Sequence, residues 1–567
     1  MTLGEVAYKE IEAFKNGTVQ LTDGDSFSQY QNIRRINRYK AGKFWDCPDV
    51  NALFWQLATP RIPLYAKSID LDTKDFRMIG IGKFNWFKAW ILNVRFKKWA
   101  RENRLSITLD DTADGISTYG SMVWKKSYDS DGEVRLDLVN LQNLSFDQTV
   151  KNIIDSPVAE THFMTEMEIR KRYPEQAKEA IEKAERARDN EGNDAESEDE
   201  RYMVIERWGE HKEEEQDVPV YKHIIVIGQG DAEVVLVDDD IKIGSDGKPK
   251  EFPYFDFHGE RVPGRWQALG VVERLFPITE QANKLVNQND DANDIASLLL
   301  FRTNDPKTKG NILDSVRTGQ IVNSEDMQQL GIDNRFISTF INQLQLIEQK
   351  ADSLCYINDS ISGDTPPSGV PFRSLAVATK AAKSTFRYIK TSIGEKMGFV
   401  LQEQIMPDQV KKFGREELID IMEEDADLRF YDEIVADREI REWMKGKAMV
   451  FEEDIEAKRE EVKERLRREG RQEKMPKFDF KWGIYMNPTG ESVDKNTQNA
   501  AIDGALADMA ANPAIVNTPL YQQKLENNGI ASFRLSKQEE AKLTQTQGQP
   551  LPAPPQVDKL SQLADIG

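Results

Sequence analysis

The sequence predicts an α+β protein of several domains, and two observations carry this prediction. Strand-like patterns separated by turn residues gather in residues 118–139 and 202–237, whereas long helical patterns dominate from residue 277 onward. Separate blocks of strands and helices along one chain are typical of the α+β class. The length of 567 residues corresponds to about three or four domains at roughly 150 residues each.

The composition is that of a folded chain rather than a disordered or membrane-spanning one. Hydrophobic residues make up 39% and charged residues 31% of the sequence. The longest apolar stretch, Ile295–Phe301, is far shorter than the roughly 20 residues of a membrane helix. Glu5 and Lys9 interrupt the N-terminus, so we expect no signal peptide there. Cys47 and Cys355 are too few for a disulfide framework and predict synthesis in a reducing cytoplasm.

The net charge argues against tight DNA binding by charge neutralisation. The chain carries 76 Lys and Arg residues against 97 Asp and Glu residues, a formal charge of −21, whereas proteins that hold the phosphate backbone present basic surfaces. Residues 83–104 are an exception, with seven cations against Glu102 alone in an amphipathic helical pattern. Two interpretations stay open for this helix: a solvated face that meets acidic neighbours, or a nucleic-acid contact.

The first half of the chain has helical patterns followed by hairpins. Residues 1–40 read as a polar helical start. Strand-like residues 118–126 and 133–139 flank the turn sequence Asp129–Gly132, which predicts a β-hairpin. Thr165, followed three residues later by Glu168, predicts a capped helix start. Further expectations are strands at 202–208, 221–227 and 232–237, with the charged stretch 183–217 as a solvated excursion.

The middle of the chain contains a long helical pattern, residues 277–300, with a narrow apolar stripe and otherwise mostly Asn, Asp and Gln. The stripe consists of Ile278, Ala282, Leu285, Ala292, Ala296 and Leu299. At about 1.5 Å per residue, this helix would be roughly 36 Å long. A narrow seam on so polar a helix favours packing against neighbouring helices over burial in a globular core.

The second half alternates long helices with interruptions. A short module at 302–319, with a strand at 319–322, leads to a helix at 335–357. The Pro/Gly-rich segment 362–371 cannot be helix or central strand. The later expectations are a long helix at 374–405, charged helices within 416–470, a strand at 478–485, a helix at 490–511 and an unfolded tail from 538.

The long helix at 374–405 presents a basic stripe on one face. The stripe consists of Lys380, Lys383, Arg387 and Lys390, at spacings of three or four residues. It would contact either an acidic neighbouring subunit or DNA, and the residues do not choose between the two.

No pattern of catalytic, metal-binding or cofactor-binding residues stands out. A phosphate-binding GxxxxGK[ST] loop is absent. Gly228–Gly230 lies between two strands and predicts a hairpin turn rather than a dinucleotide site, and Asp238–Asp240 predicts a solvated turn rather than a cation site. The four histidines are scattered without metal-ligand spacing, and both cysteines read as structural thiols. We therefore expect a protein that is not an enzyme and holds neither a metal nor a cofactor.

The order of the parts resembles the portal proteins of tailed bacteriophages, especially those of short-tailed phages. A β-rich region precedes a helix, a small module, a second helix, a Pro/Gly-rich loop and a long helix. Gly264-Arg-Trp-Gln-Ala-Leu-Gly270-Val-Val-Glu273, followed by Gln281, Asn283 and Asn287, looks like the start of the first stem helix in portals. Tyr119-Gly120-Ser-Met-Val-Trp124 and Val139–Asp147 resemble segments of the portal wing. The resemblance covers residues 25–410.

The resemblance implies an α+β portal fold with an α/β wing, a two-helix stem, a small α/β clip, a long wing helix and a helical crown. Its expected segments are 1–264 for the N-terminal helices and wing, 265–300 for the first stem helix, 301–334 for the clip, 335–358 for the second stem helix, 359–374 for the tunnel loop, 375–480 for the long wing helix and the rest of the wing, 481–537 for the crown and 538–567 for a Gln/Pro-rich tail.

The implied function is that of a ring of about twelve subunits at one capsid vertex of a virion. Double-stranded DNA would be packaged through its channel by the terminase and would later leave the same way. The implied partners are other copies of the chain, DNA, the terminase large subunit, tail adaptor proteins, and the major capsid and scaffolding proteins, with no membrane.

The resemblance also nominates contact residues. Lys307, Lys309, Arg317 and Arg335 are clip candidates for a partner or DNA. Gly363, Asp364, Thr365, Pro366, Pro367 and Arg373 belong to the tunnel loop. This loop is rich in proline and contains a single cation, which argues against a strong hold on DNA there.

Two other functions compete with the portal. One is a nucleic-acid-processing enzyme or its accessory subunit, which would use the basic helices as a DNA surface. The other is a different virion ring or adaptor protein, although 567 residues with an inserted module is large for an adaptor.

Overall fold

The computed structural model describes most of the chain up to residue 486. The described residues are 2–21, 24–46, 52–81, 86–129, 132–190, 201–211, 220–228, 232–245, 247–297, 301–302, 328–329, 335–357, 372–411, 425–445, 451–468, 482–486 and 504. The chain divides into two compact units, Met1–Met486 and Asn487–Gly567, and the elements below belong to the first. Within the described residues, no helix combines the length and apolar character that a membrane crossing requires.

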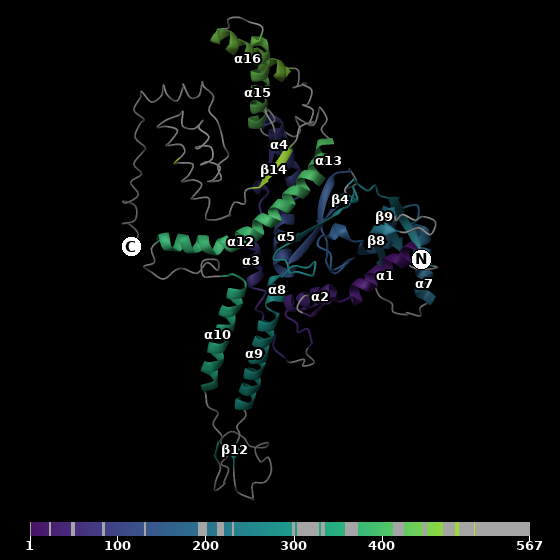
Figure 1. Ribbon diagram of the computed structural model, residues 1–567, viewed down its shortest axis with the longest axis vertical. Helices are drawn as coiled ribbons and strands as arrows, with labels where there is room; N and C mark the ends of the chain where they lie inside the picture. Colours follow the sequence, from purple (N-terminus) through teal and green to yellow (C-terminus); the bar gives the residue numbers. More distant parts are fainter. Residues whose placement is uncertain are drawn as a thin grey trace, which may run out of the picture. The chain divides into compact units, whose positions relative to one another are not determined.

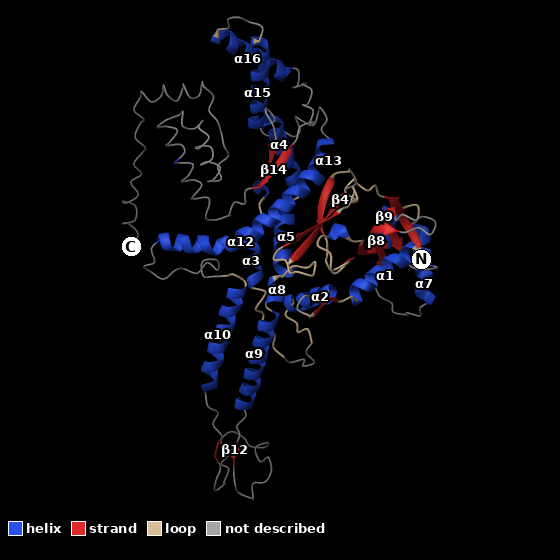
Figure 2. Cartoon of the chain, in the orientation of Figure 1, coloured by secondary structure: helices blue, strands red, loops and turns tan. Residues whose placement is uncertain are grey.

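The described elements confirm an α+β protein with several antiparallel sheets (Figure 2). A five-stranded sheet has the order β10-β9-β8-β7-β6, and a three-stranded sheet has the order β11-β4-β5. The strands of the first are β6 Leu144–Phe146, β7 Val158–Thr165, β8 Arg201–His211, β9 Val220–Ile227 and β10 Val234–Asp240. Those of the second are β4 Ser121–Tyr128, β5 Val134–Leu138 and β11 Tyr254–His258.

The predicted hairpin is confirmed as β4 and β5, which pair antiparallel with Trp124 opposite Leu138. The Asp129 side chain accepts a hydrogen bond of 2.8 Å from the Glu133 amide and closes the turn. The predicted start of the first strand was wrong, because residues up to Tyr119 end helix α5, Leu105–Tyr119. Leu105, Leu109, Ala113 and Ile116 of this helix are buried at helical spacing, and near its end the successive residues Gly115–Thr118 are all buried.

The five-stranded sheet confirms the other predicted strands and corrects one turn. β9 and β10 pair from Ile227 opposite Val234 onward, and Gly228 adopts φ of +74°, so the glycine pattern is a hairpin connection. Asp238–Asp240 is not a turn: these residues extend β10 and pair with β9, where Lys222 lies 3.2 Å from Asp238 and 3.7 Å from Asp240. The lysine partly neutralises the acidic run.

Local capping signals are confirmed where they were predicted. Thr165 caps α6, Glu166–Arg172, and its side chain and that of Glu168 form both bonds of a capping box. Part of the predicted charged excursion is ordered, because α7, Ala177–Asn190, and β8 fall within it. The N-terminal helical region is likewise two helices, α1 Leu3–Asn16 and α2 Gln29–Lys40, separated by the short strands β1 Val19–Gln20 and β2 Ser26–Phe27.

The predicted basic helix is confirmed as α4, Trp86–Glu102. Its apolar face enters the core, with Leu92, Phe96 and Trp99 almost completely buried. The Trp99 indole donates a hydrogen bond of 2.9 Å to the Val134 carbonyl, which fixes the helix on the hairpin. Helix α3, Arg61–Ile69, packs on the same core.

The predicted helix at 277–300 is confirmed as α9, Phe276–Ser297, which follows the short helix α8, Val271–Arg274. Helix α10, Arg335–Leu354, contacts α9, and the two lie side by side in Figure 1. Between them, β12, Phe301–Arg302, pairs with β13, Gln328–Gln329. The pairing brings together the two ends of the predicted clip segment.

The predicted long helix is confirmed and extends past its expected end. Helix α12, Phe372–Val400, continues through a π-helical turn, Leu401–Ile405, into α13, Met406–Lys411. Among its described side chains, the predicted apolar face is buried, including Phe386, Ile389, Ile393, Met397 and Val400.

The last described elements return to the N-terminal part of the chain. Strand β14, Trp482–Met486, confirms the predicted strand and pairs with β3, Phe76–Gly80. Helices α15, Asp425–Met444, and α16, Glu452–Arg468, confirm the charged helical region and share a small apolar cluster with Ile91 of α4.

Candidate functional site: the junction of sheet, stem and long helix

Two of the segments that carry the sequence resemblance meet in space. Residues 119–124 run from the end of α5 into β4, and residues 264–273 lead into α8. Gly120 and Gly270 touch where the two segments meet. Gly120 has φ of +83°, and a Cβ there would lie 2.0 Å from the Ala268 carbonyl oxygen. A Cβ on Gly270 would lie 2.4 Å from the Thr118 carbonyl oxygen. Both positions therefore require glycine.

Polar side chains hold this junction together. The Ala268 amide donates to Ser121 Oγ over 2.9 Å, and the Gln267 amide group donates to the Tyr119 carbonyl over 2.9 Å. On the other side, Glu273 accepts from Arg265 over 2.6 Å. These bonds satisfy groups that would otherwise be buried without partners, and they fix the start of α8 and α9 on the sheet.

Asp256 of β11 lies at the centre of the junction. Its Oδ2 accepts from His258 Nε2 over 2.8 Å, from the Trp266 indole over 3.0 Å and from the Ile153 amide over 3.2 Å. Its Oδ1 faces Lys396 of α12 over 2.6 Å. We call Ser121, Asp256, His258, Trp266 and Lys396 the Asp256 network. It joins the sheet, the segment before α8 and the long helix α12.

The charge states within this network follow from the contacts. Burial alone would raise the pKa of Asp256, but the hydrogen bond from His258 and the charge of Lys396 hold it well below its usual range. Burial lowers the pKa of His258, and Asp256 opposes that shift only in part. Asp256 is therefore ionised and His258 neutral near pH 7.

Ser121, His258 and Asp256 form a hydrogen-bonded series like that of serine hydrolases, but their geometry serves packing. Ser121 Oγ lies 2.9 Å from His258 Nδ1. The side chain of Ser121 is fully buried, and its oxygen already accepts the Ala268 N–H. A nucleophile must reach a substrate, and the fully buried Ser121 oxygen has no access to one.

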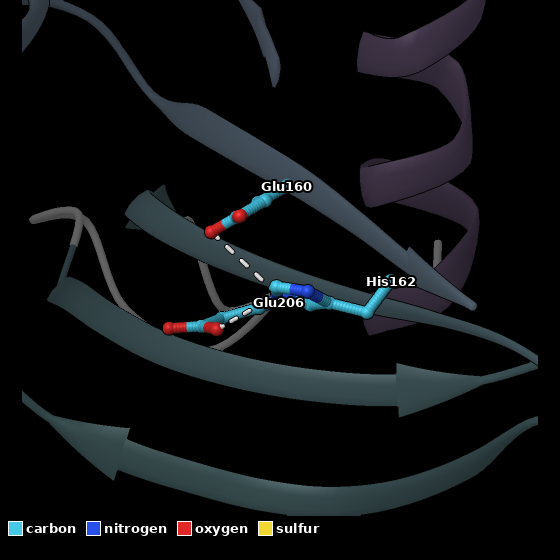
Figure 3. Close-up of side chains that lie close together, drawn as sticks. All are labelled: Glu160, His162 and Glu206. Carbon is cyan, nitrogen blue, oxygen red and sulfur yellow. Dashed lines mark hydrogen bonds and ion pairs between the residues drawn. The ribbon is translucent and has the colours of Figure 1, made fainter. Parts of the chain in front are cut away.

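A second buried cluster joins the two sheets. Lys125 of β4 lies 2.6 Å from Glu160 of β7 and 2.6 Å from Glu206 of β8. His162 Nε2 lies 3.2 Å from Glu206, and the Tyr254 hydroxyl donates to Glu160 over 2.8 Å. We call these five residues the Lys125 cluster, and Figure 3 shows Glu160, His162 and Glu206 in it.

Sequence reasoning missed this cluster because its members come from separate strands. The period-two spacing of Glu160 and His162 was the one available signal, since alternate residues of a strand share a face. Glu160, His162 and Glu206 offer three ligand atoms within 4.8 Å of one another, which is a metal-like arrangement. The Lys125 ammonium, however, lies against the same two carboxylate oxygens. A metal ion would have to displace the lysine. These three side chains therefore fit an ion-pair contact with Lys125 better than a metal centre.

The charges of the Lys125 cluster stabilise one another. Burial lowers the pKa of Lys125, but Glu206 and Glu160 outweigh it and the net shift is upward. Burial raises the pKa of Glu206, but hydrogen bonds from His162 and His223 and the charge of Lys125 hold it well below the usual value. Burial and the two glutamates raise the pKa of Tyr254 well above the usual value. Lys125 and Glu206 therefore stay charged, and Tyr254 stays neutral.

The stem-stripe residues fall into different environments. Ile278 and Ala282 are buried in the chain's own core, and Leu285 packs against it. Ala292 is exposed. The Ala296 side chain and Leu299 lie outside the described residues. Polar residues of the same helix also face inward, since Asn283 Oδ1 accepts from the Trp55 amide over 2.6 Å.

Most predicted contact residues of the clip and loop lie outside the described part of the chain. These are Lys307, Lys309, Arg317, Gly363, Asp364, Thr365, Pro366 and Pro367. Arg335 begins α10 and Arg373 lies in the first turn of α12, and neither side chain is described. Cys47, the predicted strand at 319–322 and the tail from 538 are also outside; Gly504 alone is described within the predicted helix at 490–511, and it is helical.

The basic helices are resolved in part. In the stripe of α12, the side chains of Lys380 and Lys383 are not described, Arg387 is exposed and Lys390 is half-buried. In α4, Arg95 is buried and donates to Gln409 over 2.9 Å, with Glu133 4.0 Å away. Lys98 lies 3.9 Å from Glu102. These two cations of α4 meet partners in their own chain. The second cysteine, Cys355, is a buried thiol, and burial raises its pKa to about 11.

Comparisons with known proteins add a single kind of finding. No protein-family model matches the sequence, and no curated protein matches it. Among solved structures, the chain is similar to a chain described as "Virion of native gene transfer agent (GTA) particle", with a TM-score of 0.34 and 9% sequence identity. The match covers 80% of this chain and 98% of that chain. The chain is thus similar to a chain of a virion particle.

Proposed function

We propose that this chain is the subunit of a portal-type ring that forms a DNA conduit at one vertex of a phage-like capsid. The proposal rests on the order of parts in the sequence and on one structural observation, the paired helices α9 and α10 closed by β12 and β13. Phe301 pairs with Gln329, so the residues between these strands are an insertion that begins and ends at one place. A two-helix stem with an inserted clip has this connectivity.

The exposed side chains of the two stem helices support assembly into a ring. On α10, Ile341 is 47% exposed and Leu346 is 64% exposed, whereas Ile347 and Ala351 on its other side are buried in the core. On α9, Asp290, Asp291 and Ala292 are exposed. A helix that leaves large apolar side chains in water is stabilised by a neighbour that covers them, and head-to-tail contacts in a closed ring supply one to every copy.

The net charge fits a conduit rather than a clamp. A ring of about twelve chains at −21 each would carry on the order of −250, which repels phosphates over most of the surface. DNA moves more easily past a wall that does not attract each phosphate in turn. The clip contacts at Lys307, Lys309 and Arg317, the α12 stripe, and the terminase, adaptor, capsid and scaffolding partners belong to the same proposal.

Electron microscopy of the purified full chain tests the proposal directly. We expect rings with an axial hole wide enough for duplex DNA. Compact monomers that persist in the presence of capsid components, or measurable nucleic-acid hydrolysis by the chain, would contradict it and favour the enzyme alternative.

A double substitution tests the part played by the stem. We expect Ile341→Glu with Leu346→Glu to leave the chain folded, because both side chains are exposed in the single chain, and to abolish rings in mass photometry and micrographs. Met167→Glu is the matched control, since Met167 is an 80% exposed apolar residue on a different helix, α6. Rings that form equally well in the double variant would show that these exposed side chains of α10 are not part of an interface.

A further inference from the structure

Lys396 is the one charged contact of Asp256 that can reach water without unfolding the junction. Its side chain is 35% exposed, whereas that of Asp256 is 5% exposed and that of His258 is 3% exposed. His258, Trp266 and Ile153 all bind Oδ2, and Lys396 alone among the described residues binds Oδ1. The bond that ties α12 to β11 is therefore separable from the bonds that hold the sheet to residues 264–273.

The hydrogen-bond directions fix the protonation state in which all partners agree. Ionised Asp256 accepts from His258 Nε2–H, so the neutral ring presents Nδ1 as an acceptor for the Ser121 hydroxyl. Ser121 Oγ in turn accepts the Ala268 N–H. A proton added at Nδ1 would remove the acceptor of the Ser121 hydroxyl and place a second positive charge beside Lys396.

Three charged groups act on the His258 ring. Asp256 on the same strand attracts the proton, whereas Lys396 on α12 and Arg261 in the following loop repel it. Ser121 on the neighbouring strand contributes a neutral hydroxyl. Because Lys396 is a repelling charge with access to water, protonation of the ring and departure of the lysine favour each other.

We propose that His258 is a proton-operated latch for α12. While the ring is neutral, Asp256 holds Lys396 and the helix stays docked on β11. When the ring takes up a proton, the Asp256–His258 pair balances its own charge, and Lys396 turns to water. What then holds α12 is its apolar face, from Phe386 to Val400, and the close approach of Gly394 and Gly398 to Met486 and Ile484 of β14.

The latch does not depend on the proposed ring, because every residue in it belongs to one chain. In a portal-type subunit it would control the helix that follows the predicted tunnel loop, so acidification would loosen the base of that loop. If the chain forms no rings, the proposal about His258 is unaffected. If the pH test of His258 fails, the proposed ring is unaffected.

Hydrogen exchange of the full chain, read by mass spectrometry, tests the latch. Between pH 7.5 and pH 5.5, after correction for the intrinsic exchange rate, we expect the protection of residues 386–400 to fall about five- to tenfold, as expected for loss of one part-exposed charged hydrogen bond. Protection of α5 should not change. Unchanged protection of α12 over this interval would overturn the proposal.

Two substitutions separate the latch from a general acid effect. Lys396→Met should lower the protection of α12 already at pH 7.5 and remove the pH step, whereas Arg387→Met, an exposed cation on the same helix, should keep the step. His258→Gln should also remove the step while Lys396 remains. If the Lys396→Met variant still shows the full fall in protection of α12 between pH 7.5 and pH 5.5, the proposal is overturned. This result does not depend on whether the His258→Gln variant is stable.

Discussion

The Lys125 cluster and the Asp256 network use the same chemistry for different ends. Each places a lysine 2.6 Å from a buried carboxylate between two elements. The Lys125 side chain is 15% exposed and contacts two carboxylates, whereas that of Lys396 is 35% exposed and contacts one. A mostly buried lysine that contacts two carboxylates is a permanent lock, and a more exposed lysine that contacts one is a breakable contact. The comparison teaches that burial of the cation decides whether an ion pair fixes a fold or permits movement.

The largest expected effect comes from breaking the permanent lock. Lys125→Met leaves Glu160 and Glu206 buried without their shared cation, so we expect the free energy of unfolding to fall by about 3–5 kcal/mol. Urea denaturation measures it. Lys74→Met is the control, because its side chain is 83% exposed beside Asp72, and we expect less than about 0.5 kcal/mol. A loss below about 1 kcal/mol for Lys125→Met would place the cluster among ordinary surface pairs.

The next largest effect is expected from acid, which should weaken both the Lys125 cluster and the Asp256 network. The folded-state pKa values of Glu206 and Asp256 lie below their unfolded values, so the unfolded chain binds more protons as the pH falls through about 4. The stabilisation is present above that pH and is lost below it, by about 2–3 kcal/mol per carboxylate between pH 5 and pH 2. Urea midpoints at several pH values measure it. Stability that does not decline below pH 4 would contradict the assigned charges.

A smaller effect is expected at the far end of the Asp256 network. Ser121→Ala leaves the Ala268 amide and His258 Nδ1 without a partner, and we expect a loss of about 1–2 kcal/mol. Ser127→Ala, on the same strand, removes an exposed bond to Asp137 and should cost under about 0.5 kcal/mol. Equal losses of unfolding free energy in the two variants would mean that the buried Ser121 contributes no more to stability than the exposed Ser127.

The smallest expected effect is the titration of His258 itself. Its pKa is lowered in the folded chain, so the stabilisation is complete above the unfolded value of about 6.5 and declines as the pH falls below it, by no more than about 1 kcal/mol at pH 5.5. Thermal denaturation of the wild type and of His258→Gln at pH 7.5 and 5.5 measures the difference. A larger pH dependence in the variant than in the wild type would reverse the assignment.

Sequence reasoning succeeded where the cause is local. Thr165 and Glu168 lie three residues apart, and a capping box needs nothing else. The β4–β5 turn follows from Asp129 and Gly132. Helix α9 follows from a long stretch that no glycine or interior proline interrupts, and the first two thirds of α12 are likewise free of both. Helix α5 was missed although Leu105, Leu109 and Ala113 are buried at helical spacing. Its last turn contains Ile116 and Thr118, β-branched residues that favour strands.

Sites built from distant residues could not be predicted in the same way. Histidines that look scattered in the sequence converge because β7, β8 and β9 are neighbours: His162 and His223 both approach Glu206. β14 pairs with β3 across the length of the chain. No local pattern encodes which strands become neighbours, since that depends on how all apolar faces are covered at once.

By itself, then, the sequence determined the α+β class, most of the helices and hairpins, the acidic charge and an order of parts that resembles portal proteins, because each depends on neighbouring residues or on composition. Only the tertiary structure decided that Gly120 meets Gly270, that Lys125 lies between two carboxylates and that Lys396 reaches Asp256. Those contacts depend on long-range packing, in which buried charges find partners after the sheets and helices have closed around them.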